Sequence, residues 1–287
     1  IGGDPRPAFL LRLAAAKVQL AAGRREPARA ELDGAMAAWD GLTPGERTPD
    51  DHLQYARLLA MRGREAELGG LYAEAAAFCD QAAAHIRETR CDEFEYMFDA
   101  QFHAAMLRAL LAAGADIQAV LAVDYGAGND LVAPTWDPVR LTRAVETAAA
   151  QQAAARRDGK PEQHLHALRV GLALRALRQD VRARVALMAA TAPEAPEYVR
   201  LRALVELGNL DDAGDDPWNS ARWFLEAGTL PASDPYAELY LSFRVAEQRL
   251  AINHMVDEAR TALLAIASTS PDSPLAIRAQ ELLAATR

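Results

Sequence analysis

Apolar residues recur at three- and four-residue spacing in block after block along the chain, and short segments containing Gly, Pro or Asp separate the blocks. This is the periodicity of helices that bury one face, and the short separators predict antiparallel neighbours. Alanine is abundant, aromatic residues make up only 6%, and β-branched residues are sparse, so strands have little to build on. The sequence therefore predicts an all-α chain of about fourteen helices.

Proline and glycine mark the expected ends of these helices. Proline suits the first helical turn, where its missing N–H costs nothing, and this predicts helix starts near Pro138, Pro161, Pro196 and Pro235. Glycine after an apolar run predicts a left-handed C-terminal cap, which we expect at Gly23, Gly63, Gly114 and Gly208.

Several predicted helix pairs share a pattern. The residue expected at the turn is followed by a small, a large and a small residue about five, nine and twelve positions later. The copies are Gly23 with Ala28, Leu32 and Ala35; Gly63 with Leu68, Tyr72 and Ala75; and Gly114 with Ala119, Val123 and Gly126. Looser copies are Arg178 with Ala183, Leu187 and Ala190, and His254 with Ala259, Leu263 and Ile266. A further copy starts at Gly208 and Ala213 and is broken by Gly214–Pro217.

This pattern resembles the tetratricopeptide repeat over most of the chain. The spacing is about 40 residues from Gly23 to Gly63 and about 51 from Gly63 to Gly114, against about 34 in the family, so the resemblance is to degenerate repeats with lengthened helices. It implies an α-α superhelix, a TPR-like solenoid of antiparallel helix pairs. We expect N-terminal repeats over 1–124, a connecting loop over 125–137 and C-terminal repeats over 138–287, which can also form one continuous solenoid.

The net charge and the lack of long apolar runs exclude some classes of binding partner. A net charge of −9 argues against general nucleic-acid binding, which needs a clustered basic surface. No apolar run approaches the roughly 20 residues that cross a bilayer, so we expect no membrane insertion. The cytoplasm is the favoured compartment and the periplasm or envelope the alternative, because a start at Ile1 leaves open the removal of a leader or an upstream domain. The preference for arginine over lysine is typical of a GC-rich bacterial genome.

Catalytic and metal-binding motifs are missing from the sequence. There is no G-x-S-x-G, HExxH or Walker sequence. His164 and His166 are two residues apart, so on a helix they point in different directions and do not form a metal pair. The other histidines are scattered singly and are read as surface or core residues. We therefore expect no cofactor, no metal and no enzymatic activity.

Three other sequence features each have a structural interpretation, which we favour, and a functional alternative. Cys79 and Cys91 are expected to be inert thiols too far apart for a disulfide. The segment Val123–Pro138 is read as a connector, with a specific contact site as the alternative. The acidic run departs from the register of a calcium loop and is read as a solvated loop between helices; it consists of Asp211, Asp212, Asp215 and Asp216.

One group of basic residues emerges when the repeats are aligned. Six positions before each expected turn, on the first helix of the pair, lie Lys17, Arg57, Arg108 and Arg202, while the other two copies have Leu172 and Gln248. The tetratricopeptide resemblance implies that this position lines a ligand-binding groove. A basic row on an acidic protein favours an acidic or carboxylate-bearing segment as the ligand.

The resulting hypothesis is a non-catalytic scaffold that binds a peptide or helix of a partner protein in a groove. One alternative is the sensor or regulatory arm of a larger multidomain bacterial protein, such as a transcriptional regulator. The other is a helical enzyme with an unrecognised pocket, which would need a convergent group of acids and bases. The sequence does not indicate the oligomeric state.

Overall fold

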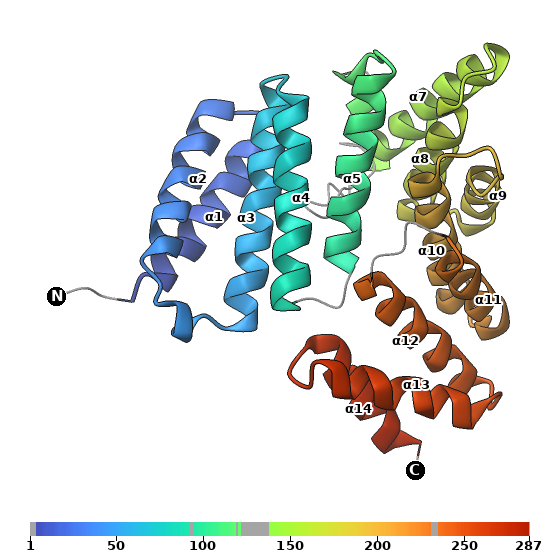
Figure 1. The fold of residues 1–287 in the computed structure, drawn as a ribbon. Helices are drawn as coiled ribbons and strands as arrows, with labels where there is room; N and C mark the ends of the chain where they lie inside the picture. The colour runs from blue at the N-terminus through green and yellow to red at the C-terminus, as the bar shows by residue number, and fades with distance from the viewer. Residues whose placement is uncertain (1–3, 92–94, 119, 122–137, 231–234, 287) are drawn as a thin grey trace. The chain divides into compact units, whose positions relative to one another are not determined.

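The computed structural model describes residues 4–91, 95–118, 120–121, 138–230 and 235–286 (Figure 1). Within these ranges 82% of the residues are helical and none forms a strand. This confirms the predicted all-α class and the helix content of more than about 65% that propensity and periodicity predict. No helix in the described ranges is long and apolar enough to cross a membrane. The described residues divide into two compact units, one up to residue 118 and one from residue 120.

Within the described residues, unit 1 contains five α-helices numbered α1 to α5, each antiparallel to the next and packed against it (Figure 1). They are α1 (Arg6–Ala21), α2 (Arg25–Asp40), α3 (Pro49–Leu68), α4 (Tyr72–Thr89) and α5 (Glu95–Ala112), with a short 3-10 turn, η1 (Pro44–Glu46), between α2 and α3. Besides these neighbours, α1 also contacts α3. The helices therefore form successive pairs, in which α1, α3 and α5 are first helices and α2 and α4 are second helices. The first helix of one pair, α1, contacts the first helix of the next, α3.

Unit 2 repeats this arrangement with eight helices in the described residues. They are α7 (Pro138–Arg157), α8 (Glu162–Ala176), α9 (Asp180–Ala190), α10 (Glu197–Ala213), α11 (Pro217–Gly228), α12 (Pro235–Ala251), α13 (Val256–Thr269) and α14 (Pro274–Ala285). Here α8 contacts α10, and α12 contacts α14, across the intervening helix. Pro138 and Pro235 begin helices as predicted, whereas Pro161 and Pro196 immediately precede α8 and α10.

A residue with positive φ ends the first helix of each pair. The predicted turns at Gly23 (φ 69°) and Gly114 (φ 61°) are confirmed. The other turn residues are Gly70 (φ 72°), Arg178 (φ 59°), Asp215 (φ 60°) and Asn253 (φ 52°). After Gly23, Gly70, Arg178 and Asp215 the second helix begins two residues later; after Asn253 it begins three residues later. A left-handed residue lets the chain reverse at once, so the two helices lie antiparallel and close together.

The small–large–small pattern identifies the side of the second helix that packs on the first. Five, nine and twelve positions after the turns at Gly23, Gly70, Arg178 and Asp215, its members are Ala28, Leu32 and Ala35; Ala75, Cys79 and Ala82; Ala183, Leu187 and Ala190; and Ser220, Phe224 and Ala227. After Asn253 each spacing is one residue longer, and the members are Ala259, Leu263 and Ile266. Each is at most 4% exposed. The copies predicted from Gly23, Arg178 and His254 are confirmed, whereas the residues predicted after Gly114 lie outside the described residues or lack a described side chain.

Two predicted turns are wrong. Gly63 lies inside α3 and Gly208 inside α10, seven residues before the true turns at Gly70 and Asp215. A Cβ atom on Gly63 would lie 3.1 Å from the Ala75 carbonyl oxygen, and one on Gly208 would lie 2.7 Å from the Phe224 ring. These glycines therefore permit close approach of the second helix instead of ending the first.

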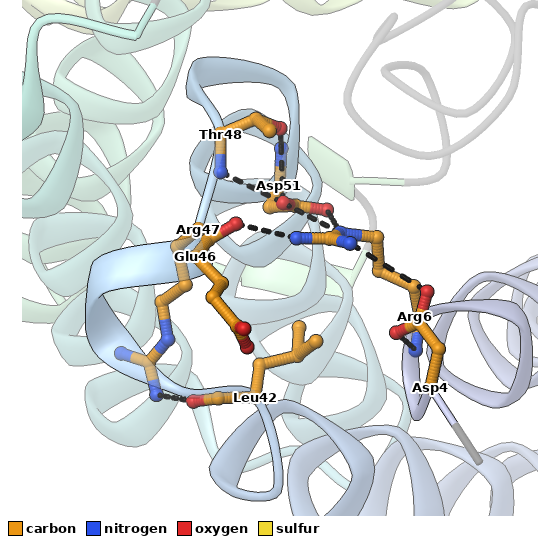
Figure 2. A network of polar contacts seen from close by, with 7 residues as sticks. All are labelled: Asp4, Arg6, Leu42, Glu46, Arg47, Thr48 and Asp51. Carbon is orange, nitrogen blue, oxygen red and sulfur yellow. Dashed lines mark hydrogen bonds and ion pairs between the residues drawn. The ribbon is translucent and has the colours of Figure 1, made fainter.

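A polar network holds the start of α1 against the segment that leads into α3 (Figure 2). The Arg6 Nε donates to both Asp51 carboxylate oxygens at 3.1 and 3.0 Å, and its Nη2 donates to the Glu46 carbonyl. Asp51 also accepts the Thr48 backbone N–H at 2.8 Å, and the Thr48 hydroxyl accepts the Asp51 N–H, which forms a capping box. Burial alone would raise the pKa of Asp51, but these hydrogen bonds outweigh it and the pKa is lowered.

We expect Asp51→Ala to lower the free energy of unfolding by about 1–3 kcal/mol, because it removes a helix cap and leaves Arg6 without its carboxylate. Urea denaturation followed by circular dichroism measures the change. Asp50→Ala, at the neighbouring exposed position in the same helical turn, is the matched control and should change stability by less than about 0.5 kcal/mol. Equal effects of the two substitutions would contradict the assigned role of Asp51.

Candidate binding surface

The predicted basic positions of unit 1 share one helical face in spite of the wrong turn at Gly63. Lys17 and Arg108 lie six residues before the turns at Gly23 and Gly114, but Arg57 lies thirteen before Gly70. Seven residues make two helical turns and rotate a side chain by only about 20°, so Arg57 keeps the same face two turns further along. The residue six positions before Gly70 is Arg64, which the sequence analysis missed. We call Lys17, Arg57, Arg64 and Arg108 the basic face of unit 1.

Contacts between neighbouring first helices position two members of the basic face. The Arg57 guanidinium lies 5.7 Å from the centroid of the Tyr96 ring on α5, a cation–π distance. Arg64 donates to Glu67 at 3.1 Å, and Glu67 also contacts His103 of α5. Glu67 is buried, so this network ties α3 to α5 and leaves little of Arg64 exposed.

The other two members are more open to solvent. Lys17 is exposed on α1. Arg108 on α5 forms an ion pair with Asp80 of α4, with 55% of its side chain exposed against 43% for Asp80. An exposed ion pair of this kind contributes about 0–1 kcal/mol, so a ligand carboxylate can take the place of Asp80 at little cost.

Arg202, the fourth predicted site residue, lies on α10 in unit 2, thirteen residues before Asp215. Its side chain is only 16% exposed and pairs with buried Glu206 at 2.7 Å, while Glu206 also pairs with Arg175 of α8. This cluster satisfies a buried carboxylate between two first helices. Because Arg202 belongs to unit 2, it is not a member of the basic face of unit 1.

The acidic run of unit 2 is a set of structural contacts, so its reading as a solvated loop is wrong for part of it. Asp211 is fully buried, accepts the Trp223 indole N–H at 2.8 Å and pairs with Arg184. Asp212 accepts from Arg244 at 2.6 Å and from Gln248 at 2.8 Å. The remaining members are the exposed turn residue Asp215 and Asp216, which caps α11. The run thereby connects α9, α10, α11 and α12.

Two histidines that seemed isolated in the sequence lie together in unit 1. His52 Nδ1 of α3 is 3.1 Å from His85 Nε2 of α4, so one ring donates its N–H to the other. Trp39 stacks on Tyr55 and meets both histidines edge-on, and the Arg47 guanidinium lies 4.2 Å from the Trp39 ring. A search of the described residues finds no group of three or more side chains that could hold a metal ion.

Burial shifts the pKa values of these two histidines and of Cys79. Burial lowers the pKa of His85 to about 4, and the neighbouring His52 and Arg47 lower it further. Burial, and after it the charge of Arg47, also lowers the pKa of His52. Burial raises the pKa of the Cys79 thiol. Cys79 and Cys91 are both buried thiols that form no disulfide, as predicted.

Comparison with known proteins gives structural neighbours only. No protein-family model and no curated protein sequence matches the chain. The apo quorum sensor NprR from B. thuringiensis aligns with 96% of this chain and 68% of its own, at 12% identity and a TM-score of 0.41. A tetratricopeptide-repeat STAND protein from Pyrococcus horikoshii aligns with 96% of this chain and 38% of its own, at 14% identity and a TM-score of 0.43.

A kinesin light chain protein from Podosopora anserina with TPR-like repeats aligns with 76% of this chain and 95% of its own, at 18% identity and a TM-score of 0.38. The chain's own turns, its buried small–large–small positions and its contacts between first helices make it a TPR-like helical repeat protein with degenerate repeats.

The histidine pair makes the stability of unit 1 depend on pH. In the unfolded chain both histidines take up protons near pH 6.5, whereas the folded pKa of His85 is about 4. Between these values the unfolded state binds more protons, so the free energy of unfolding falls as the pH falls. We expect His85→Gln to reduce the loss between pH 7 and pH 5 by on the order of 1 kcal/mol, after allowance for partial solvent screening.

Urea denaturation at the two pH values measures this difference. His254→Gln, at an exposed histidine of unit 2, is the control and should leave the pH dependence unchanged. An identical loss in the wild type and His85→Gln would show that the pair does not contribute.

Proposed function

We propose that unit 1 is a non-catalytic binding module that holds an acidic, carboxylate-bearing peptide segment of a partner protein along the basic face. The observation that supports this most directly is the position of Lys17, Arg57 and Arg108, while Arg64 is engaged by buried Glu67. The first three of these residues lie on equivalent faces of three first helices, α1, α3 and α5, and contacts link α1 to α3 and α3 to α5.

The charge of the rest of the protein favours selectivity. On a chain with a net charge of −9, a local basic face attracts a negative segment while the remaining surface repels it, which raises the association rate and makes it sensitive to salt. Arginine binds carboxylates through two parallel hydrogen bonds, so Arg57 and Arg108 add geometric specificity that Lys17 supplies less well.

The two arginines are also oriented before a ligand arrives. Tyr96 lies under the guanidinium of Arg57, and Asp80 holds Arg108 by an exposed ion pair. A side chain already held near its bound position loses less conformational entropy on binding. An extended segment with acidic side chains, or one ending in a free carboxylate, is the ligand that such a row of cations accommodates.

Reversing the charge at Arg57 and Arg108 together should weaken binding of an acidic peptide by more than about tenfold at low salt. The probe is a fluorescein-labelled Glu- and Asp-rich peptide with a free C-terminus, followed by fluorescence anisotropy at low and high salt. An amidated version of the peptide separates recognition of the terminal carboxylate from recognition of acidic side chains.

The control variant reverses Arg24 and Arg182, which are exposed and lie outside the basic face, so the net charge changes equally. We expect the control to bind the peptide within about twofold of the wild type. If the two double variants weakened binding equally, net charge alone would explain the effect, and the proposed site would be contradicted. A wild-type affinity that does not change with salt would contradict it as well.

A further inference from the structure

The outer side of α1 is an uncovered apolar helix face. Leu11 and Val18 are 73% and 66% exposed. The residues between and beside them on the helix are alanines, chiefly Ala14, Ala15 and Ala21. At about 100° per residue these positions cover an arc of roughly 120°, and the charged side chains of α1 fall outside it. A contiguous apolar face of this kind on a helix surface marks an interaction site.

The equivalent face of α3 is an established helix interface. Leu58 and Met61 belong to the same buried cluster as residues of α1 and α2. On the same side of α3, Arg62 pairs with Asp33 and Glu65 pairs with Arg25, both on α2. Measured from the turns at Gly70 and Gly23, the α1 residues in these four positions are Leu11, Ala14, Ala15 and Val18.

The face of α1 therefore continues the stacking pattern of unit 1 and has the register to receive an antiparallel helix, as α3 receives α2. The chemistry differs in one respect. Where α3 carries Arg62 and Glu65, α1 carries Ala15 and Val18, so its partner helix needs apolar side chains in place of Asp33 and the two arginines of α2.

We propose that this face pairs with α1 of a second copy of the chain, so that the protein forms a twofold-symmetric dimer. The spacing on α1 is self-complementary about the midpoint between Ala14 and Ala15. In an antiparallel pair Leu11 lies opposite Val18 of the second copy, Ala14 opposite Ala15, and Ala8 opposite Ala21. A twofold interface requires this kind of correspondence, because the same surface serves both partners. The central alanines let the two helices approach closely.

The charges at the edges of the arc are compatible with the pair. Arg12 already pairs with Glu31 of α2 at 3.2 Å, and Lys17 projects from the side that belongs to the basic face. The dimer therefore buries no unpaired charge. The dimer proposal and the acidic-peptide proposal are independent of each other, because the dimer depends on apolar contact and peptide binding depends on cations.

Sedimentation velocity of the full chain from about 1 to 200 µM tests the dimer, because a single helix pair gives an interface at the small end of the range, which needs a high protein concentration. We expect the wild type to approach twice the monomer mass at the highest concentration. Val18→Glu should remain monomeric throughout, since the pair places two such carboxylates in apolar surroundings. Val185→Glu is a matched control on α9, because Val185 and Val18 are 68% and 66% exposed, and it should dimerise like the wild type.

Leu11→Glu provides a second test on the same face, and circular dichroism confirms that each variant is folded. A wild type that stays monomeric at 200 µM would overturn the proposal and assign the α1 face to a different occupant. Dimerisation of folded Val18→Glu or Leu11→Glu would overturn it as well, as would loss of the dimer in Val185→Glu. Peptide binding by a folded monomeric variant would separate this result from the test of the basic face.

Discussion

Close contact between the two helices of a pair is the constraint on which the rest of the structure depends. Seven residues before the turn, three first helices carry glycine, and the large residue nine positions after the turn packs onto it: Cys79 on Gly63, Leu187 on Gly171 and Phe224 on Gly208. A left-handed turn residue makes this approach possible, because it reverses the chain within two residues. In these three pairs the turn, the glycine and the large residue keep a fixed spacing.

The same framework supports two kinds of contact between successive pairs. In unit 1 charged contacts, as where Arg25 and Arg29 of α2 meet Glu65 of α3, lie beside the buried apolar cluster that α3 shares with α1 and α2. In unit 2 the first helices α8 and α10 are buried around most of their circumference, and ion pairs such as Arg175–Glu206 lie within that packing. Buried carboxylates with arginine partners fix which helix faces meet, because an unpaired carboxylate would be costly there.

The sequence determined the helical class and much of the repeat pattern. Propensity and periodicity act over a few residues, so they predicted helices, the caps at Gly23 and Gly114, and the buried positions that follow Arg178. The predicted basic residues Lys17, Arg57 and Arg108 lie on equivalent faces of α1, α3 and α5 although the turn at Gly63 was wrong, and their role in binding stays a prediction. The error of seven residues is two helical turns, and it left Arg57 on the same side of its helix.

Tertiary structure decided what depends on partners distant in the chain. A glycine that ends a helix and one that admits a neighbouring helix look alike in sequence, and only the packing of Cys79 and Phe224 distinguishes Gly63 and Gly208 from true turns. The pairing of His52 with His85 and the burial of Asp211 likewise require residues from separate helices. The sequence thus set the local geometry of each helix pair, while the contacts between pairs decided which charges are used internally and which stay available, because burial and ion pairing depend on proximity in space.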